Sequence, residues 1–218
     1  MGLAMTSGWI EADWPAPRGI IAGTTPRGAD FDLPAEPRWL NQVHGADVVR
    51  WEDLAAGDPP DADAIVSADR GSLCVVRTAD CLPVLLCSGD GAEIAAIHAG
   101  WRGLAAGVVE AAISALQTAP ADLLAWFGPA ISQPAFEVGD EVREAFCTAS
   151  ADAAAAFERN ARGRWQADLY RLGRQRLAAA GVRAVHGGGL CTYGDPGRFY
   201  SYRRDQSAGR MLSFVYKP

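Results

Sequence analysis

Two histidines and one cysteine of this chain combine metal-binding side chains with positions beside a glycine or a turn. His44 lies in NQVHG, Cys81 in TADCLP and His98 in HAGWRG. Two imidazoles and one thiolate leave one open position on a tetrahedral Zn²⁺ ion, which is the coordination of catalytic zinc. Such an ion lowers the pKa of a bound water or polarises a substrate oxygen. The three residues therefore predict the active site of an enzyme.

The spacing of these three residues, taken alone, also permits simpler explanations. Their positions match no short zinc-finger pattern. A histidine in an apolar strand is commonly a hydrogen-bonded core residue, and a buried cysteine commonly packs as a small apolar side chain. Residue types and spacing thus leave both a metal site and ordinary core packing open.

Polar residues near these positions supply further candidate chemistry. Asp80 precedes the candidate thiolate and is a candidate to orient an imidazole or to shuttle a proton, with capping of the turn as the alternative. Asn41 and Gln42 are candidates for hydrogen bonds to a base or to a ribose hydroxyl. Arg102 and Arg203 are candidates to hold an anion. These residues predict a substrate site beside the metal.

The remaining cysteines, two aspartates and the third histidine are less strongly indicated as parts of this site. Cys191 follows a glycine run and is a candidate to lie beside the ligands. Asp61 and Asp63 are expected to be turn residues. The residues expected only to pack or to serve the structure are Cys74, Cys87, Cys147 and His186.

The composition indicates one acidic globular domain. A chain of 218 residues suits a single core, and its 49% apolar residues supply one without disulfides. The formal net charge of −6 argues against a duplex nucleic-acid binder. Positive charge is almost entirely arginine. An arginine-rich segment near the C-terminus suits a planar or phosphorylated anion, and its members are Arg198, Arg203, Arg204 and Arg210.

Cysteine usage and apolar runs indicate the cellular compartment. The five cysteines are an odd number and form no CxxC pair, and the N-terminus lacks the basic and apolar segments of a secretory signal. The apolar stretches fall well short of the roughly 20 residues that span a bilayer. We therefore expect a cytoplasmic protein with reduced thiols and no membrane partner.

Strand-like runs outnumber helix-like segments. The expected strands are residues 19–25, 46–51, 62–67, 72–78, 83–88, 92–98, 123–127, 182–186, 199–204 and 211–216. One helix is expected directly after His98, one from about Asp140 towards Phe157, and one from Asp168, as N-cap, to Gly181. This pattern lacks strict βαβ alternation. It predicts an α+β fold, with mixed β-sheets flanked by helices in one domain over residues 1–218.

Several motifs together resemble the YfiH/laccase-domain family, also called the multicopper polyphenol oxidase family. They are NQVHG at 41–45, DADAIVSA at 61–68, TADCLPVLL at 78–86, IAAIHAGWRGL at 94–104, GPAI at 128–131, EVGDEV at 137–142, CT at 191–192 and FYSYRRDQSAGR at 199–210. The combination of TADCLP with HAGWRG is highly specific. One departure from the family pattern is a shorter segment before residue 41, which puts any substrate contact from that segment in doubt.

The resemblance implies that His44, Cys81 and His98 are the metal ligands. It implies a fold shared distantly with the catalytic domain of a cytotoxic necrotising toxin. Family members are described as purine nucleoside enzymes that cleave adenosine, inosine or methylthioadenosine with phosphate and deaminate adenosine. The expected partners are thus a purine nucleoside and phosphate, with Zn²⁺ favoured over Cu²⁺ as cofactor, in a monomer or a homodimer.

Three alternatives remain open. The first is an amidase or cysteine hydrolase that edits peptidoglycan precursors, with Cys81 as the nucleophile and His98 as its base. The second is a copper-dependent polyphenol oxidase, for which three histidines and one cysteine-based site supply few of the ligands that a multicopper cluster needs. The third is a binding protein without turnover, which the shortened N-terminal segment makes conceivable.

Overall fold

Two packed sheets form the centre of the molecule. The computed structural model describes residues 8–28, 32–54 and 57–218. The larger sheet has the order β12-β8-β6-β7-β4-β3, with parallel pairing of β12 to β8 and of β3 to β4 and antiparallel pairing elsewhere. Its strands are β3 (Val48–Arg50), β4 (Ala64–Ser67), β6 (Leu82–Ser88), β7 (Ile94–Ala99), β8 (Leu123–Phe127) and β12 (Ala184–Gly187).

The smaller sheet is antiparallel and has the order β1-β2-β13-β5. Its strands are β1 (Ile10–Glu11), β2 (Ile21–Thr24), β5 (Ser72–Thr78) and β13 (Met211–Lys217). Apolar side chains from both sheets pack between them, including Val76 and Val215 from the smaller sheet and Leu85 and Ala96 from the larger. This shared core explains the near-continuous apolar runs of the sequence.

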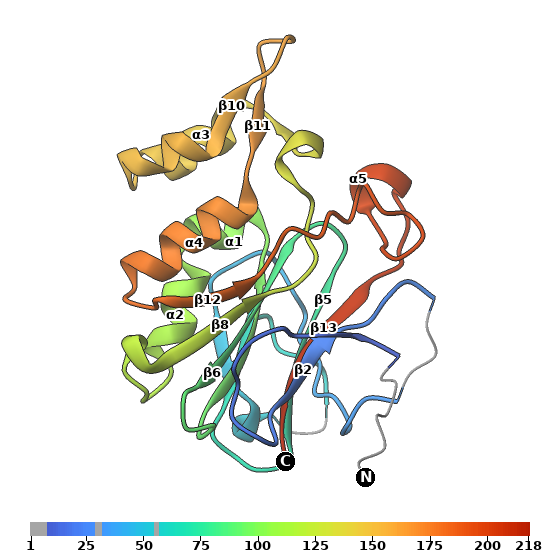
Figure 1. The fold of residues 1–218 in the computed structure, drawn as a ribbon, viewed down its shortest axis with the longest axis vertical. Coiled ribbons are helices and arrows are strands. Elements are labelled where there is room, and N and C mark those ends of the chain that lie inside the picture. The colour runs from blue at the N-terminus through green and yellow to red at the C-terminus, as the bar shows by residue number, and fades with distance from the viewer. Residues whose placement is uncertain (1–7, 29–31, 55–56) are drawn as a thin grey trace.

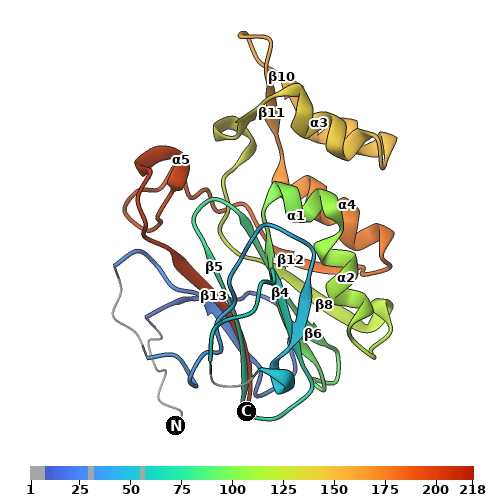
Figure 2. The same cartoon turned by 180° about the vertical axis from the view of Figure 1, so that it is seen from behind.

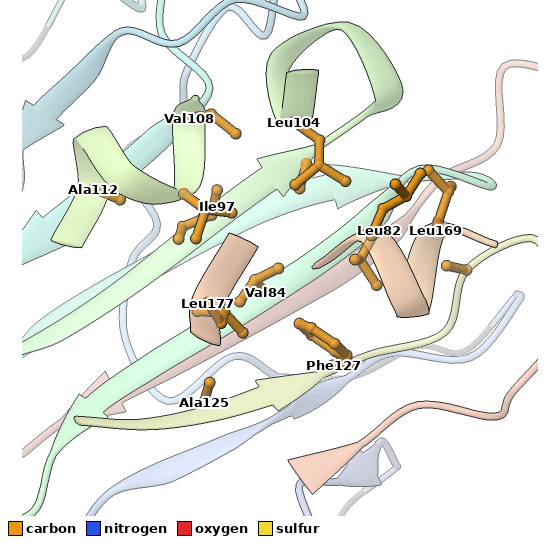
Figure 3. Close-up of a cluster of buried hydrophobic side chains, with 14 of the residues drawn as sticks. Leu82, Val84, Ile97, Leu104, Val108, Ala112, Ala125, Phe127, Leu169 and Leu177 are labelled. Carbon is orange, nitrogen blue, oxygen red and sulfur yellow. The ribbon is translucent and has the colours of Figure 1, made fainter. Parts of the chain in front are cut away.

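Helices cover the outer face of the larger sheet. They are α1 (Trp101–Ala106), α2 (Val108–Ser114) and α4 (Leu169–Ala179), and both views place them on the side away from β5 and β13 (Figures 1 and 2). Alternation along β6 turns Leu82 and Val84 towards these helices, where they meet Leu104 and Leu177 (Figure 3). The mixed sheets with flanking helices confirm the predicted α+β class.

A small third sheet extends the molecule at one end. It has the order β10-β11-β9 and lies beside α3 (Figure 1). Its elements are β9 (Glu137–Val138), α3 (Asp140–Cys147), β10 (Phe157–Arg159) and β11 (Trp165–Ala167). The short 3₁₀ helices of the chain are Trp51–Asp53, Pro120–Asp122, Gln133–Ala135 and Ala151–Ala156.

Helix boundaries follow capping and glycine geometry. Asp168 accepts a hydrogen bond from the backbone N–H of Arg171 and so caps α4 as predicted. The single helix expected after His98 is instead two helices, because Gly107 adopts a φ of 95° between α1 and α2. The helix expected from Asp140 towards Phe157 ends at Cys147, and a 3₁₀ helix follows.

The predicted strand over residues 199–204 is wrong. Tyr202–Asp205 form a short helix, α5, above the ends of β5 and β13 (Figure 1). The Ser201 hydroxyl accepts a hydrogen bond from the backbone N–H of Arg204, and the Asp80 carboxylate accepts one from the N–H of Arg203. These two acceptors satisfy N–H groups that the first turn of a helix leaves free. A contact distant in sequence therefore overrides the strand-like pattern.

Two expectations on sulfur and membranes are addressed by the structure. All five cysteines are free thiols, and Cys74 and Cys87 are buried in apolar strands. Within the described ranges, no helix combines the length and the apolarity needed to cross a bilayer.

Candidate metal and substrate site

Three segments far apart in the sequence bring His44, Cys81 and His98 together. His98 lies near the end of β7, and Cys81 directly precedes β6, which pairs with β7 so that Pro83 lies opposite His98. His44 lies in the loop before β3. One ligand atom of each residue lies within 4.8 Å of the other two, and the Cys81 Sγ lies 3.8 Å from the His44 Nε2. The three side chains therefore form one group that could bind a metal ion.

Asp63 organises the site, although its sequence position suggested only a turn. Its carboxylate is fully buried and lies 2.7 Å from the Nδ1 of His98. The same carboxylate accepts hydrogen bonds from the backbone N–H groups of Val43, His44 and Gly45. It therefore fixes both the ring of one candidate ligand and the loop of another. The only signal in the sequence was its position directly before the apolar run of β4.

Two backbone conformations at the site are costly for residues with side chains. His44 has a φ of 62° and Asp80 a φ of 94°. Such left-handed values persist only where surrounding contacts enforce them. The carboxylate of Asp63 enforces the first, and hydrogen bonds from the Thr192 hydroxyl and the Arg203 N–H to the Asp80 carboxylate accompany the second. The backbone conformations of His44 and Asp80 thus depend on buried carboxylates.

Glycines let the start of α1 approach the ligands closely. A Cβ on Gly100 would lie 2.8 Å from the His44 ring and 3.1 Å from the Cys81 Sγ. A Cβ on Gly103 would lie 2.5 Å from the carbonyl oxygen of Gly45. All three distances are shorter than ordinary contacts of a Cβ, and the 2.8 Å and 2.5 Å contacts require the neighbouring atoms to move. Each of the two glycines of the HAGWRG motif therefore has a steric reason.

The protonation of the metal-free site favours a thiolate beside an imidazolium. Burial opposes ionisation of Cys81, but hydrogen bonds with His44 and His98 outweigh it and lower the pKa of the thiol to about 6. Burial also opposes a charged His98, but hydrogen bonds with Asp63 and Cys81 raise the pKa of that imidazole to about 9. The thiolate is the form of cysteine that binds metals.

The donor set fits a metal ion. Metal–nitrogen bonds of about 2.0–2.1 Å and metal–sulfur bonds of about 2.3 Å place tetrahedral ligand atoms roughly 3.5 Å apart. The 3.8 Å between Cys81 Sγ and His44 Nε2 is close to that value. With Nδ1 of His98 facing Asp63, its Nε2 is free to be the third ligand. The group could therefore bind a metal ion with small adjustments.

A cavity of about 650 Å³ opens on this group. Its walls come from the loop before β3, the end of β5, and the segment between α5 and β13. The lining residues are Asn41, Gln42, His44, Arg77, Thr78, Ala79, Cys81, His98, Tyr202, Ala208 and Arg210. Such a volume is in the range of small-molecule sites.

Two predicted substrate-binding residues line this cavity with their amides partly engaged. The Asn41 Nδ2 donates a hydrogen bond of 2.6 Å to the carboxylate of Asp61. The Gln42 amide donates to the carbonyl and accepts from the N–H of Arg77, as a neighbouring strand would. These contacts orient both side chains at the cavity wall.

Other predicted residues lie outside the cavity lining. Arg102 lies on α1 with its guanidinium 4.5 Å from the ring centroid of Trp101. Arg203 donates a hydrogen bond from Nη1 to the carbonyl oxygen of Glu137. Arg203 and Arg204 do not alternate across a strand, because both belong to α5. The arginines that do line the cavity are Arg77 and Arg210.

Asp80 and Cys191 lie on a neighbouring hydrogen-bonded segment. The Asp80 carboxylate accepts from the Thr192 hydroxyl and from the Arg203 N–H, and the imidazole contact expected of it belongs to Asp63 instead. The Cys191 thiol accepts a hydrogen bond from the Ser132 hydroxyl at 2.9 Å. Burial opposes ionisation of Cys191, but that bond and nearby N–H groups lower its pKa.

The family model described as multi-copper polyphenol oxidoreductase laccase matches residues 27–217, nearly the whole chain. The chain belongs to this family. The YfiH/laccase-domain resemblance of its motifs is thereby confirmed.

Relatives in this family carry informative names. A protein of Pseudomonas aeruginosa named purine nucleoside phosphorylase is 46% identical over 242 residues, covering 95% of this chain and 98% of that protein. The Escherichia coli purine nucleoside phosphorylase YfiH is 51% identical over 188 residues, covering 85% of this chain and 75% of its own. A Neisseria meningitidis crystal structure superposes with a TM-score of 0.90 at 40% identity, covering 96% of this chain and 99% of that one.

Proposed function

We propose that this laccase-family protein is a zinc-dependent purine nucleoside phosphorylase acting on adenosine, inosine or methylthioadenosine, with adenosine deamination as a second reaction. The observation that carries the proposal is the group of His44, Cys81 and His98 opening into a cavity of nucleoside size. The names of relatives at 46% and 51% identity support the phosphorolytic reaction.

The proposal assigns each residue of the site a role in binding the metal ion, binding the nucleoside or moving protons. His44, Cys81 and His98 would hold the ion, which supplies a Lewis acid and an activated water when bound. Asp63 keeps the His98 ring in the tautomer that presents Nε2. Asn41 and Gln42 would orient the nucleoside through hydrogen bonds to the base or the ribose. Asp80, beside Cys81, is the residue proposed to move protons.

Phosphorolysis requires a simple exchange of bonds. A phosphate oxygen forms a bond to the anomeric carbon of the ribose while the glycosidic C–N bond breaks. The electron pair of that bond goes to the purine, which takes up a proton and leaves as the free base. The products are ribose 1-phosphate and the base. The cavity must therefore hold an anion close to the sugar.

The test is a mass-spectrometric time course with zinc-loaded protein on adenosine and inosine, with and without phosphate. Phosphate-dependent release of base with ribose 1-phosphate is the expected result, and inosine from adenosine without phosphate reports deamination. His44→Ala should lower both zinc content and turnover. His186→Gln is the matched control, because the Nε2 of this histidine on β12 has no hydrogen-bond partner among the residues that the structure describes. A zinc-loaded wild type without either product would refute the proposal.

A second candidate function rests on the same residues. Asp63, His98 and Cys81 lie in the order of a catalytic triad, with a carboxylate orienting the imidazole beside a thiol of lowered pKa. In this candidate, an amidase, Cys81 attacks an amide carbonyl, His98 protonates the leaving amine, and water then hydrolyses the thioester to release the acid and the thiol. Activity on amides that survives zinc removal would favour the amidase. Activity that is lost when zinc is removed would favour the metalloenzyme.

A further inference from the structure

The lining of the cavity beside His44, Cys81 and His98 carries positive charge, as the binding site of an anion would. Arg77 and Arg210 line it, and its lining contains no aspartate or glutamate. Neither guanidinium forms an ion pair with a carboxylate in the described part of the chain. The protein as a whole has a formal net charge of −6. The positive charge of the cavity is therefore a local property of these two arginines and not of the protein as a whole.

Strand register brings the two arginines to one face of the β5–β13 ribbon. Arg77 lies opposite Leu212, and Met211 lies opposite Thr78. Arg210 comes two residues before Leu212, so it shares a face with Arg77 and is its diagonal neighbour. Diagonal neighbours lie roughly 7–8 Å apart, which is within reach of two long side chains converging on one ligand.

Each guanidinium is held by backbone carbonyl groups through one of its nitrogens. The Arg210 Nη1 donates to the carbonyl oxygens of Ser207 and Gly209, and the Arg77 Nη2 donates to that of Leu40. A guanidinium has five N–H donors, so each retains donors in a fixed orientation. Such forked donors match the oxygens of a phosphate.

Thr78, the last residue of β5, also belongs to the cavity lining but is 1% exposed, and its hydroxyl has no hydrogen-bond partner among the described residues. Successive residues of a strand point to opposite faces, so the Thr78 side chain lies on the face opposite to that of Arg77 and Arg210. The two guanidiniums therefore carry the positive charge of this wall without the Thr78 hydroxyl.

We propose that Arg77 and Arg210 bind a phosphate dianion, and that they replace Arg102 and Arg203 in this role. The dianion is either free inorganic phosphate, the co-substrate of the reaction proposed above, or the phosphate of a nucleotide. The former source rests on the proposed function. The latter does not.

The experiment measures inorganic phosphate binding by calorimetry and the KM for phosphate at saturating inosine, using zinc-loaded protein. Arg77→Gln and Arg210→Gln should each raise the Kd and the KM for phosphate at least about 10-fold and change the KM for inosine less than about threefold. Arg210→Lys should recover part of the affinity because it keeps the charge. Arg183→Gln, at an exposed loop position away from the cavity, is the matched control.

A parallel arm identifies the source of the phosphate. Inosine 5′-monophosphate is compared with inosine in the same calorimeter. Tighter binding of the nucleotide that both glutamine variants abolish would assign the subsite to a substrate-borne phosphate. Thermal melts without phosphate show whether each variant is folded.

The outcomes separate this proposal from the proposed function. If the wild type binds phosphate or nucleotide through both arginines but cleaves no nucleoside, the proposed subsite stands and the phosphorylase hypothesis is refuted. The opposite outcome is also possible: the wild type cleaves nucleosides, but Arg77→Gln and Arg210→Gln, shown to be folded, bind phosphate and nucleotide as tightly as Arg183→Gln does. The phosphate subsite is then refuted, and the phosphorylase proposal stands.

Discussion

Replacing Asp63 with asparagine removes one charge from the buried group that positions two candidate metal ligands. The carboxylate accepts backbone N–H groups at residues 43–45 through both oxygens and contacts the Nδ1 of His98. An asparagine has a single acceptor oxygen, so its NH₂ group must face at least one donor that it cannot satisfy. Hydrogen bonds to charged groups contribute about 1.5–3 kcal/mol each, and breaking a buried ion pair costs about 3–5 kcal/mol. We expect Asp63→Asn to lower the free energy of unfolding by about 3 kcal/mol.

The same substitution should weaken metal binding. Loss of the partner that orients a ligating histidine typically lowers metal affinity about 10–100-fold. Zinc affinity is measured by competition with a chromophoric chelator, and stability by denaturant unfolding of the metal-free protein. The matched control is Asp61→Asn, two positions earlier, because the exposed carboxylate of Asp61 contacts the Asn41 side chain and no candidate ligand.

Asp61→Asn should stay within about 0.5 kcal/mol of the wild type in stability and keep its zinc affinity. The proposed role of Asp63 would be refuted if Asp63→Asn behaved like this control in both measurements. Lower stability with unchanged zinc affinity would show that Asp63 holds the loop and not the ligand geometry.

Three further predictions concern groups around the site and the core. Gly103→Ala should lower stability by about 1–3 kcal/mol and weaken zinc binding, because the new Cβ must push α1 away from the Gly45 carbonyl; denaturant melts and chelator competition measure this. Thr78→Val should raise the stability of the ligand-free protein by about 1 kcal/mol, because it removes a buried hydroxyl without a partner; a thermal melt showing a loss would contradict the orphaned state. Burial opposes ionisation of Glu93, but hydrogen bonds from Thr118 and neighbouring N–H groups lower its pKa. A carboxyl with a lowered pKa stabilises the fold above its unfolded-state pKa, and this stabilisation is lost as pH falls through the folded-state pKa. Glu93→Gln should therefore cost about 1.5–3 kcal/mol near pH 7 and progressively less towards about pH 3, as paired denaturant melts would show.

Local patterns predicted much of the fold because several elements depend mainly on nearby residues. The apolar runs of Ser72–Thr78 and Leu123–Phe127 predicted β5 and β8 with the observed bounds. Asp168 predicted the start of α4, because its side chain caps the helix from within the same segment. Tyr202–Asp205 could not be predicted in this way, since the acceptor for one of their N–H groups is Asp80, far away in the sequence.

The site residues likewise separate into those that local sequence could predict and those that depend on contacts distant in sequence. Residue types alone singled out His44, Cys81 and His98, and the resemblance assigned them as ligands. The role of Asp63 was missed, because an aspartate before a strand has the local features of a turn residue. The arginines of the cavity were missed for a different reason. Strand register between β5 and β13 places Arg77 beside Arg210, and register is a property of the folded sheet.

The β6–β7 hairpin has a consequence for the order in which the site assembles. Its pairing places Cys81 and His98 together through a short loop of chain, whereas His44 joins only when its loop meets the carboxylate of Asp63. Closing the shorter loop costs less chain entropy, so a pair of ligands forms before the third. Two ligands hold an ion weakly and exchange it. An ion held by all three residues would therefore be retained only after the loop before β3 docks, so that its retention would report that folding is complete.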